Sequence, residues 1–444
     1  MEFDMLWFIY NVMFAVGYTL MLPHFLLRMW RRGGYRRNFL QRFGIYSPDV
    51  AQKLRSHRRI WIHAVSVGEM QVALSFADEM RTAGLGDSFV FTTNTSTAHA
   101  LAQNKIGADD VLLYFPSDFP FIVKRVLNTI KPQALILTEC ELWPNLIRHA
   151  HKRKIPVILV NGRISESSYR GYKLMKVFFR QIAVCVDLFL VQTPVEEQYL
   201  IELGTDRTRI KVMGTTKYDA VQPDPAGEAK ARDVLVGLGF AADAPVLLGA
   251  STWPGEECIL LDIFKRLKTP FPHLKLVLVP RHAERRAEIE SEVNNAGLTC
   301  AKRSDNTFVK CKDAPPTAPD VLLVDTTGEL MGFYACATVV FVGKSLTNHG
   351  GQNVIEPALL SKPIIVGPNM ENFSSVLSDF LSSAALVQVK DAAELETALK
   401  SLLSDKASRD DHGRRAAAVV KAKQGVLQRS IKEISEVLRT FSSH

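Results

Sequence analysis

The chain has 444 residues, of which 47% are hydrophobic and 23% are charged, a composition typical of globular and not of disordered proteins. This length exceeds that of one typical hydrophobic core and predicts two domains. The net charge of +8 is concentrated near the N-terminus, and no basic stripe interleaved with aromatic residues follows, which argues against nucleic acid as a partner. The six cysteines are scattered without a Cys-x-x-Cys pair, which argues against a zinc site or a disulfide framework.

The segment 5–27 is almost wholly apolar and, as a helix of about 30 Å, is long enough to cross a bilayer core. Arginines follow it, so the positive-inside rule places the rest of the chain in the cytoplasm. A cleaved signal peptide is disfavoured, because its basic residues would precede the apolar run. We therefore expect residues 1–30 to form a membrane-anchor helix that either spans the bilayer or lies in its interface.

The next segment, 31–43, mixes arginines with aromatic and leucine side chains and is called the basic hook below. Arg31, Arg32, Arg36 and Arg37 are expected to hold the phosphates of a lipid substrate, because guanidinium groups match phosphate geometry. Attachment to an anionic membrane surface explains the same residues equally well.

From residue 59 onward, short apolar runs alternate with helical patterns, which predicts an α/β protein with parallel sheets. The expected strands of the first half are 60–65, 89–94, 111–115, 134–139, 157–160, 188–192 and 210–213. Those of the second half are 246–250, 276–280, 321–325, 339–343, 364–366 and 386–389.

A stretch rich in Pro, Gly and Ala near residues 222–227 marks the boundary between the halves. The expected domains are 31–220, including the hook, and 221–444, in which 408–441 forms a helical, solvated outer layer. Residues 304–318 are expected to form a loop or hairpin. Neither the dinucleotide-binding nor the P-loop fingerprint is present, so the two Rossmann-like halves favour a ligand site in a cleft between domains.

The turn after the first strand contains Ser66-Val-Gly-Glu69 and leads into a helix. Ser66-x-x-Glu69 fits a capping box, in which the carboxylate satisfies a free N–H group of its own helix. Glu69 also lies at the carboxyl end of a parallel strand, where a general base would face a ligand. The turn alone favours the cap, and the two roles make different predictions for the contacts of the carboxylate.

Four strand ends in the second half carry candidate ligand residues, and one of them, the segment 325–330, has small residues that leave room for a base or ribose. Ser251 and Thr252 precede a helix start that would bind an anion. Pro280 and Arg281 end the next strand, where the guanidinium would pair with a phosphate. The loop after the strand 339–343 combines glycines with Lys344 and Ser345, and glycines let backbone amides approach a phosphate. Glu356 would accept from ribose hydroxyls, although a cap from Asn353 is the alternative.

Several of these motifs, in this order and over nearly the whole chain, resemble those of the 3-deoxy-D-manno-octulosonic acid (Kdo) transferases of lipid A assembly. They include the apolar N-terminus with its arginines, the motif 66–69, and Thr138-Glu-Cys-Glu-Leu-Trp-Pro-Asn145. They also include the segments 161–165, 214–219, 280–281, 328–330 and 350–357.

The resemblance implies a GT-B fold and an inverting glycosyltransferase that needs no metal, with CMP-Kdo as donor and a tetra-acylated lipid A precursor as acceptor. It implies an enzyme at the bacterial inner membrane. Glu69 matches the family's general base, and Glu139 and Lys217 match positions that support the transition state. The CMP-binding positions it implies are Pro280, Arg281, Gly328, Glu329, Leu330, Asn353, Val354, Ile355 and Glu356.

The chain departs from the family pattern at a few positions of the donor side. Gln352 stands where His is usual, Lys344 replaces a small residue, Thr215 replaces Asn, and Trp253 replaces His. Lys344 would add a cation near the donor phosphate. The rival functions are a membrane-associated GT-B enzyme that uses a UDP-sugar, and a membrane-bound nucleotide-binding scaffold without catalysis. A sugar-nucleotide epimerase of the same fold is disfavoured by the anchor and the basic hook.

Overall fold

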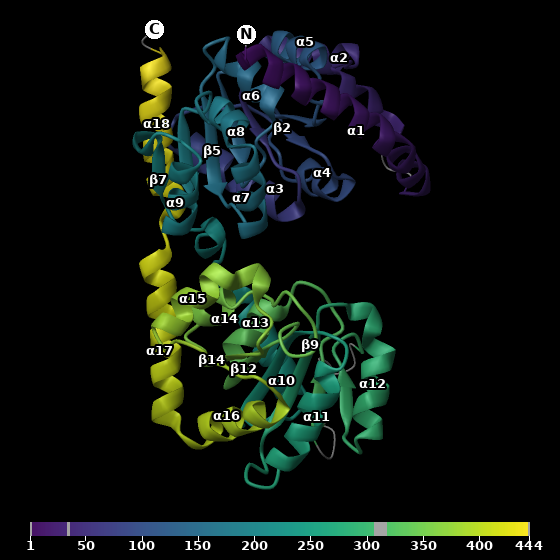
Figure 1. Cartoon of the computed structure of the whole chain (residues 1–444). Coiled ribbons are helices and arrows are strands. Elements are labelled where there is room, and N and C mark those ends of the chain that lie inside the picture. The colour runs from purple at the N-terminus through teal and green to yellow at the C-terminus, as the bar shows by residue number, and fades with distance from the viewer. Residues whose placement is uncertain (1, 33–35, 306–317, 443–444) are drawn as a thin grey trace. The chain divides into compact units, whose positions relative to one another are not determined.

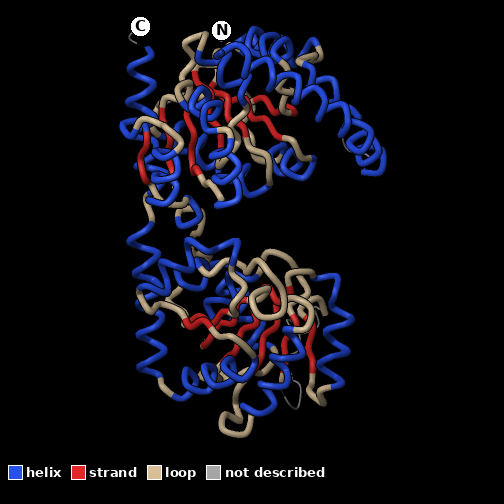
Figure 2. Tube along the Cα trace, in the orientation of Figure 1, coloured by secondary structure: helices blue, strands red, loops and turns tan. Residues whose placement is uncertain are grey.

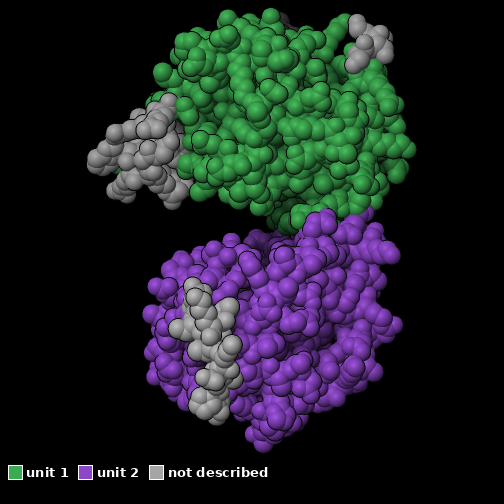
Figure 3. Space-filling view, turned by 180° about the vertical axis from the view of Figure 1, so that it is seen from behind, with its two compact units in different colours: residues 1–220, 425–444 green, residues 221–424 purple. Residues whose placement is uncertain are grey.

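The computed structural model describes residues 2–32, 36–305 and 318–442 and divides into two compact units. Unit 1 comprises Met1–Ala220 and Gly425–His444, and unit 2 comprises Val221–Gln424 (Figure 3). Each unit contains a parallel sheet of seven strands, drawn red in Figure 2, between layers of helices.

Unit 1 has the strand order β3-β2-β1-β4-β5-β6-β7, so its chain starts at the centre of the sheet and winds outward in both directions. Its strands are β1 (Ile60–His63), β2 (Phe89–Thr93), β3 (Val111–Tyr114), β4 (Ala134–Thr138), β5 (Val157–Gly162), β6 (Leu188–Val191) and β7 (Ile210–Val212). The central strands β1, β2, β4 and β5 are buried at every residue, as expected for a parallel sheet covered on both faces. This confirms the seven strands predicted for the first half.

The helices of unit 1 cover both faces of this sheet. They are α1 (Glu2–Arg32), η1 (Arg36–Phe43), α2 (Pro48–Ser56), α3 (Val67–Thr82), α4 (Ser96–Gln103), α5 (Pro120–Ile130), α6 (Pro144–His151), α7 (Glu166–Leu174), α8 (Lys176–Ala183), α9 (Pro194–Glu202), η2 (Arg207–Arg209), η3 (Thr216–Tyr218) and α18 (Val426–Ser442).

Unit 2 has the strand order β10-β11-β9-β8-β12-β13-β14. Its strands are β8 (Val246–Thr252), β9 (Lys275–Pro280), β10 (Cys300–Lys302), β11 (Val321–Leu323), β12 (Val339–Val342), β13 (Ile364–Val366) and β14 (Val387–Gln388). Its helices are α10 (Pro225–Gly237), α11 (Glu256–Leu267), η4 (Ala283–Arg285), α12 (Arg286–Asn295), α13 (Leu330–Cys336), α14 (Ile355–Leu359), η6 (Glu371–Phe373), α15 (Ser374–Ser382), α16 (Ala392–Ser404) and α17 (Lys406–Lys423).

The six predicted strands of unit 2 are present, and β10 is an addition that the sequence analysis missed. This edge strand has three residues, of which only Ala301 is buried, so it lacks the apolar run that marks a strand. Most of the expected loop 304–318 lies outside the described residues.

The C-terminal helix α18 differs from the expected domain boundary, which placed all of 221–444 in the second domain. It packs against the sheet of unit 1, where Ile431 and Ile434 join the cluster formed by β1, β2, β4 and α3. Asp219 caps it, because its carboxylate accepts from Gly425 N at 2.6 Å and from Leu427 N at 2.7 Å. Unit 1 is therefore built from both ends of the chain (Figure 1).

Among the described residues, one helix is long and apolar enough to cross a membrane, with the candidate segment Met5–His24. This segment is part of α1, which belongs to unit 1 and lies on its outside near α5 and α6 (Figure 1). The expected apolar helix is thus present, and it belongs to the first unit instead of forming a separate domain.

Candidate active site

Glu69 lies in the first turn of α3, directly after β1 at the centre of the unit 1 sheet. Ser66 Oγ accepts from Glu69 N at 3.2 Å, and Glu69 Oε1 accepts from Ser66 N at 3.3 Å, which completes a capping box. Glu69 Oε2 also accepts from Val65 N at 2.9 Å. The cap that the turn predicts is therefore present, and the expectation of a carboxylate that is free of its own helix is wrong, because both oxygens of Glu69 are bound at the start of α3.

The cap does not use the full hydrogen-bonding capacity of Glu69. A carboxylate has about four acceptor positions, and two of them receive backbone N–H groups. The Thr138 hydroxyl lies 3.2 Å from Glu69 Oε2 and 2.9 Å from the His63 carbonyl oxygen, and its single proton serves one of them at a time. Acceptor capacity therefore remains on Oε1, and the fixed cap orients this oxygen.

Glu139 follows β4, the strand beside β1, and takes a left-handed backbone conformation with φ of +54°. Its amide donates to the Val160 carbonyl at 3.0 Å, which holds this unusual turn at the end of the sheet. Burial and the neighbouring charge of Glu69 raise the pKa of Glu139, whereas Lys217 and Arg163 act in the opposite direction. The charges of Glu69 and Lys217 are thus each close enough to Glu139 to influence its pKa.

Lys217 lies in η3, and a buried asparagine fixes the position of this turn. Asn161, with φ of +52°, accepts from Thr216 N through its side-chain oxygen at 3.2 Å. Burial lowers the pKa of Lys217, Arg163 lowers it further, and Glu139 opposes both effects. The structure therefore brings together the three catalytic candidates of the sequence analysis.

Arg163 is a functional candidate that the sequence analysis did not single out. It is exposed two residues after Asn161, and its charge acts on both Glu139 and Lys217. The signal was available in the segment 161–165, where a polar residue and a glycine interrupt the end of an apolar strand.

On unit 2, the end of β9 presents Arg281 as expected. Its amide donates to the Thr252 carbonyl at 3.0 Å, which fixes the backbone, while its side chain is exposed. Within the described part of the chain, its guanidinium has no hydrogen bond or ion pair. This arrangement leaves an unpaired cation on a fixed backbone available for an anionic ligand, whereas Pro280 is buried in the sheet.

The loop after β12 differs from the expected phosphate site. Glu256, which is fully buried, accepts from Lys344 N at 2.8 Å, from Ser345 N at 2.9 Å and from Leu346 N at 2.9 Å. These amides were expected to bind a donor phosphate, and an internal carboxylate occupies them instead. Gly343 permits this approach, because an added Cβ would lie 2.6 Å from Glu256 Oε2.

The side chains of the expected phosphate site separate into two groups. Ser345 is fully buried, donates to the Val342 carbonyl at 2.6 Å and accepts from Gly367 N at 2.9 Å, and Thr252 is also fully buried. These two residues are structural, which corrects the expectation. Ser251 is partly exposed, and Lys344 Nζ lies 4.6 Å from the centre of the Trp253 ring. Lys344 therefore brings a cation to the rim of the loop.

The remaining residues expected to bind the nucleotide lie at the starts of the short helices α13 and α14. Glu329 accepts from Arg303 Nη2 at 3.0 Å, and Gly328 beside it has φ of +85°. Asn353 Nδ2 donates to Glu356 Oε1 at 3.0 Å, and burial raises the pKa of Glu356.

Three apolar members of the donor set contribute differently. Val354 and Ile355 are fully buried and present no surface to a ligand, which corrects the expectation for these two residues, whereas Leu330 is partly exposed.

Comparison with known proteins identifies the family. Residues 37–220 match the family model described as 3-Deoxy-D-manno-octulosonic-acid transferase (kdotransferase). The 3-deoxy-D-manno-octulosonic acid transferase of Bordetella pertussis is 32% identical over 437 residues, which are 95% of this chain and 99% of that protein. The protein of the same name from Haemophilus influenzae is 30% identical over 423 residues, with 95% and 96% covered.

The chain belongs to the Kdo transferase family. It is therefore a glycosyltransferase, and the alternative of a scaffold without catalysis is removed.

Solved structures support the fold of this Kdo transferase. The UDP-GlcNAc 2-epimerase from Neisseria meningitidis aligns with a TM-score of 0.54 at 13% identity and covers 84% of this chain and 100% of its own. A glycosyltransferase from Rickettsia africae aligns with a TM-score of 0.53 at 11% identity, with 87% and 99% covered. At such low identity the likeness concerns the fold alone, and it confirms two Rossmann-like units of the GT-B class.

The basic hook contains the arginines that the sequence analysis assigns to acceptor phosphates or the membrane. The side chains of Arg31, Arg32, Arg36 and Arg37 in the basic hook lie outside the described residues. Arg42, at the end of the hook, is buried and donates to the Asn94 carbonyl at 3.0 Å. The end of the hook therefore belongs to the framework of unit 1.

Proposed function

We propose that this enzyme transfers Kdo from CMP-Kdo to a lipid A precursor, with Glu69 as the general base. The observation that carries the proposal is the charged cluster of Glu69, Glu139 and Arg163, at the carboxyl ends of β1, β4 and β5, with Lys217 of η3, in a member of the Kdo transferase family. Ligands of open parallel sheets gather at this edge.

In the proposed reaction, an acceptor hydroxyl attacks the anomeric carbon of Kdo while the bond from that carbon to the CMP phosphate oxygen breaks. The hydroxyl proton passes to Glu69, and CMP leaves with its negative charge. Attack opposite the leaving group inverts the anomeric centre. Glu69 suits this role because its cap orients the carboxylate and leaves acceptor capacity on Oε1.

Cationic side chains are proposed to stabilise the charge that develops on the leaving phosphate, so no metal ion is invoked. On unit 2, Arg281 presents an exposed guanidinium and Lys344 an ammonium group beside Trp253. Glu356 would accept from the ribose, and Asn353 holds one of its oxygens. Lys217 and Arg163 would offset the negative charge around Glu69 on unit 1.

The proposed acceptor is amphiphilic and remains in the bilayer, so the enzyme has to act at the membrane surface. We propose that α1 and the basic hook bind the anionic surface of the bacterial inner membrane, with both units on the cytoplasmic side. The exposed apolar residues of α1 include Phe8, Met13, Leu20 and Met21, which are 61–74% exposed. An exposed apolar face of this kind is typical of a surface that contacts lipid, because its contact with water is unfavourable.

The test is to incubate the full-length protein with CMP-Kdo, generated in place, and a lipid A precursor, and to weigh the product by mass spectrometry. We expect a mass increase of one or more Kdo residues. The rival function, transfer from a UDP-sugar, predicts instead that UDP and not CMP raises the melting temperature. That result, together with no product from CMP-Kdo, would refute the proposed donor.

A further inference from the structure

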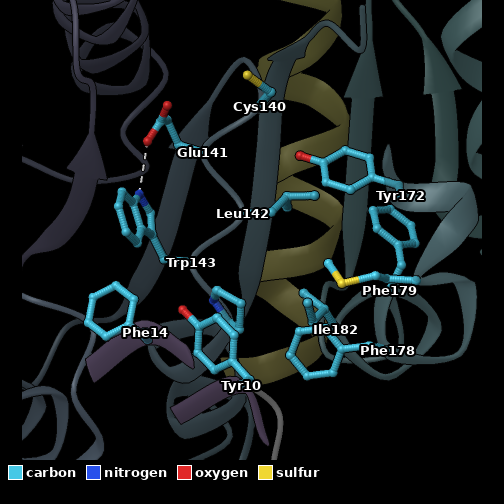
Figure 4. Close-up of a pocket in the computed structure, with 12 residues that line it drawn as sticks. Tyr10, Phe14, Cys140, Glu141, Leu142, Trp143, Tyr172, Phe178, Phe179 and Ile182 are labelled. Atoms are coloured by element: carbon cyan, nitrogen blue, oxygen red, sulfur yellow. Dashed lines mark hydrogen bonds between the residues drawn. The ribbon is translucent and has the colours of Figure 1, made fainter. Parts of the chain in front are cut away.

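Unit 1 contains an apolar groove between α1 and the helix pair α7–α8. Its inner part has a volume of about 380 Å³ and its outer part about 910 Å³, and the two parts share Tyr10, Phe14, Met175 and Phe178. Figure 4 shows the inner part, with Tyr10 and Phe14 from α1 and Tyr172, Phe178 and Phe179 from α7 and α8. We call this space the α1 groove.

The inner end of the α1 groove lies beside the charged cluster. Cys140, Glu141 and Trp143 line it, and they directly follow Glu139 along the chain. Trp143 Nε1 donates to Glu141 at 2.9 Å, the dashed line in Figure 4, and the charge of Glu141 contributes to the raised pKa of Glu139. A ligand in this groove would therefore end next to the residues proposed to act in transfer.

The outer end of the groove opens among exposed apolar side chains at the turn between α7 and α8. Leu174 is 89% exposed and Val177 is 69% exposed, and both line the groove. Lys173 and Lys176 flank them, and both are exposed. Apolar side chains beside cations are typical of a surface that enters a lipid interface with anionic headgroups.

The wall formed by α1 is held in place by polar contacts. Tyr10 donates to Asp118 at 2.9 Å, Asn11 accepts from Asn145 at 2.7 Å, and Tyr18 accepts from Ser117 at 3.0 Å. Beyond Tyr18, residues 19–32 would extend about 21 Å as a helix, which is shorter than a hydrocarbon core of about 30 Å. With these contacts in place, α1 lies along unit 1 and keeps the groove closed on that side.

We propose that the α1 groove binds an acyl chain of the lipid acceptor. This inference rests on the proposed function and adds the position of the acyl chain on the enzyme. The acceptor sugar must leave the plane of the bilayer to reach Glu69, and an acyl chain drawn into water with it would carry a large free-energy cost. A groove that runs from the apolar turn of α7–α8 to the loop after Glu139 keeps that chain in apolar surroundings.

The test uses two glycines with equal free space. Gly17 lines the outer groove, Gly171 of α7 lines neither part of it, and an added Cβ would meet no atom within 4 Å at either position. Gly17→Phe should therefore fill the groove without disturbing the fold, and Gly171→Phe is the matched control. Transfer is measured in the full-length enzyme with the acylated acceptor and with the same sugar after removal of its acyl chains.

We expect Gly17→Phe to lower kcat/KM for the acylated acceptor at least tenfold and to leave the chain-free acceptor unchanged, while Gly171→Phe changes neither. Equal losses for both acceptors, or no loss for either, would overturn the proposal.

A photolabelling experiment tests the binding of the acyl chain and does not require Kdo transfer. An acceptor with a photoreactive acyl terminus should label peptides containing 13–21 and 174–178, and Gly17→Phe should reduce this labelling at least fivefold. Equal labelling by a photoreactive phosphatidylethanolamine would show that the groove holds bilayer lipid and would overturn the assignment to the acceptor. If the photoreactive acceptor labels these peptides in the wild-type enzyme but no acceptor receives Kdo, the proposed function fails. The binding of an acyl chain in the groove then still stands.

Discussion

At the scale of single residues, Glu69 shows how one carboxylate can hold a helix start and still be available for chemistry. Its contacts to Val65 N and Ser66 N are those of a cap, and they also fix the carboxylate at the end of the central strand. A general base benefits from such orientation, because proton transfer depends first on geometry. Removing the charge while keeping a cap separates the two roles.

Glu69→Gln is expected to lower kcat by about 10²–10⁴ while the melting temperature changes little, since glutamine also occurs at this position of a capping box. The chain offers a matched control at α9, where Thr193 and Glu196 form a second capping box and Glu196 is also buried. Glu196→Gln should have a similar small effect on stability and no effect on transfer. Kinetics with the acylated acceptor and thermal unfolding of both variants provide the measurement. Wild-type activity in Glu69→Gln would remove the base assignment.

At the scale of elements, α1 is both an apolar helix and a packed part of unit 1. Its contacting residues are Trp7, the adjacent pair Tyr10 and Asn11, Phe14 and Tyr18, which recur every three or four positions and so share one face. Tyr10 donates to Asp118, which is fully buried and also accepts from two backbone amides at the start of α6. Docking of α1 is therefore linked to a buried acid.

Burial raises the pKa of Asp118 to about 7, although its hydrogen-bond donors oppose the shift. In the unfolded chain an aspartate ionises near pH ~3.9, so the folded protein holds more protons between these two values. Stability should therefore fall as the pH rises from about 4 to 7 and level off above that.

Asp118→Asn should reduce the decrease in melting temperature between pH 5 and pH 7.5. Asparagine still accepts from Tyr10 but does not titrate. Asp206 is exposed and has a lowered pKa, so Asp206→Asn should leave this slope unchanged. Thermal unfolding at the two pH values compares the variants, and identical slopes for Asp118→Asn and wild type would refute the assignment.

At the scale of the whole molecule, the C-terminal helix α18 completes the unit that contains the N-terminus. Ile434 is fully buried in the cluster with β1, β2, β4 and α3, which are the elements around Glu69. The last helix of the chain therefore supports the proposed acceptor side, although it directly follows unit 2 in sequence.

Ile434→Ala should destabilise unit 1 by about 2–5 kcal/mol, the usual effect of truncating a fully buried isoleucine. Hydrogen exchange of the full-length protein should show faster exchange in peptides from β1 and α3, with unit 2 unchanged. Val236 in α10 is 61% exposed, so Val236→Ala should change neither unit. Faster exchange confined to unit 2 in Ile434→Ala would contradict the placement of α18.

The sequence by itself determined the two Rossmann-like halves with every strand except β10, and it placed Glu69 at a helix start, whereas Glu139 and Lys217 came from the family resemblance. The strands and the helix start are local features, because a buried parallel strand needs a continuous apolar run and a helix start needs a capping residue. Only the tertiary structure decided which polar groups were already paired. Glu256 meets the amides of Lys344 and Ser345 from 88 and 89 positions away in the chain, so no local pattern could show that these amides were occupied.

The same limit applies to α18 and to Arg163. The sequence of α18 is that of an amphipathic helix. Such a pattern predicts that one face of the helix is buried, but it does not predict against which sheet. Arg163 became a candidate because the fold places the ends of β4 and β5 and the turn η3 together. Packing of distant segments, and not local preference, decided these assignments.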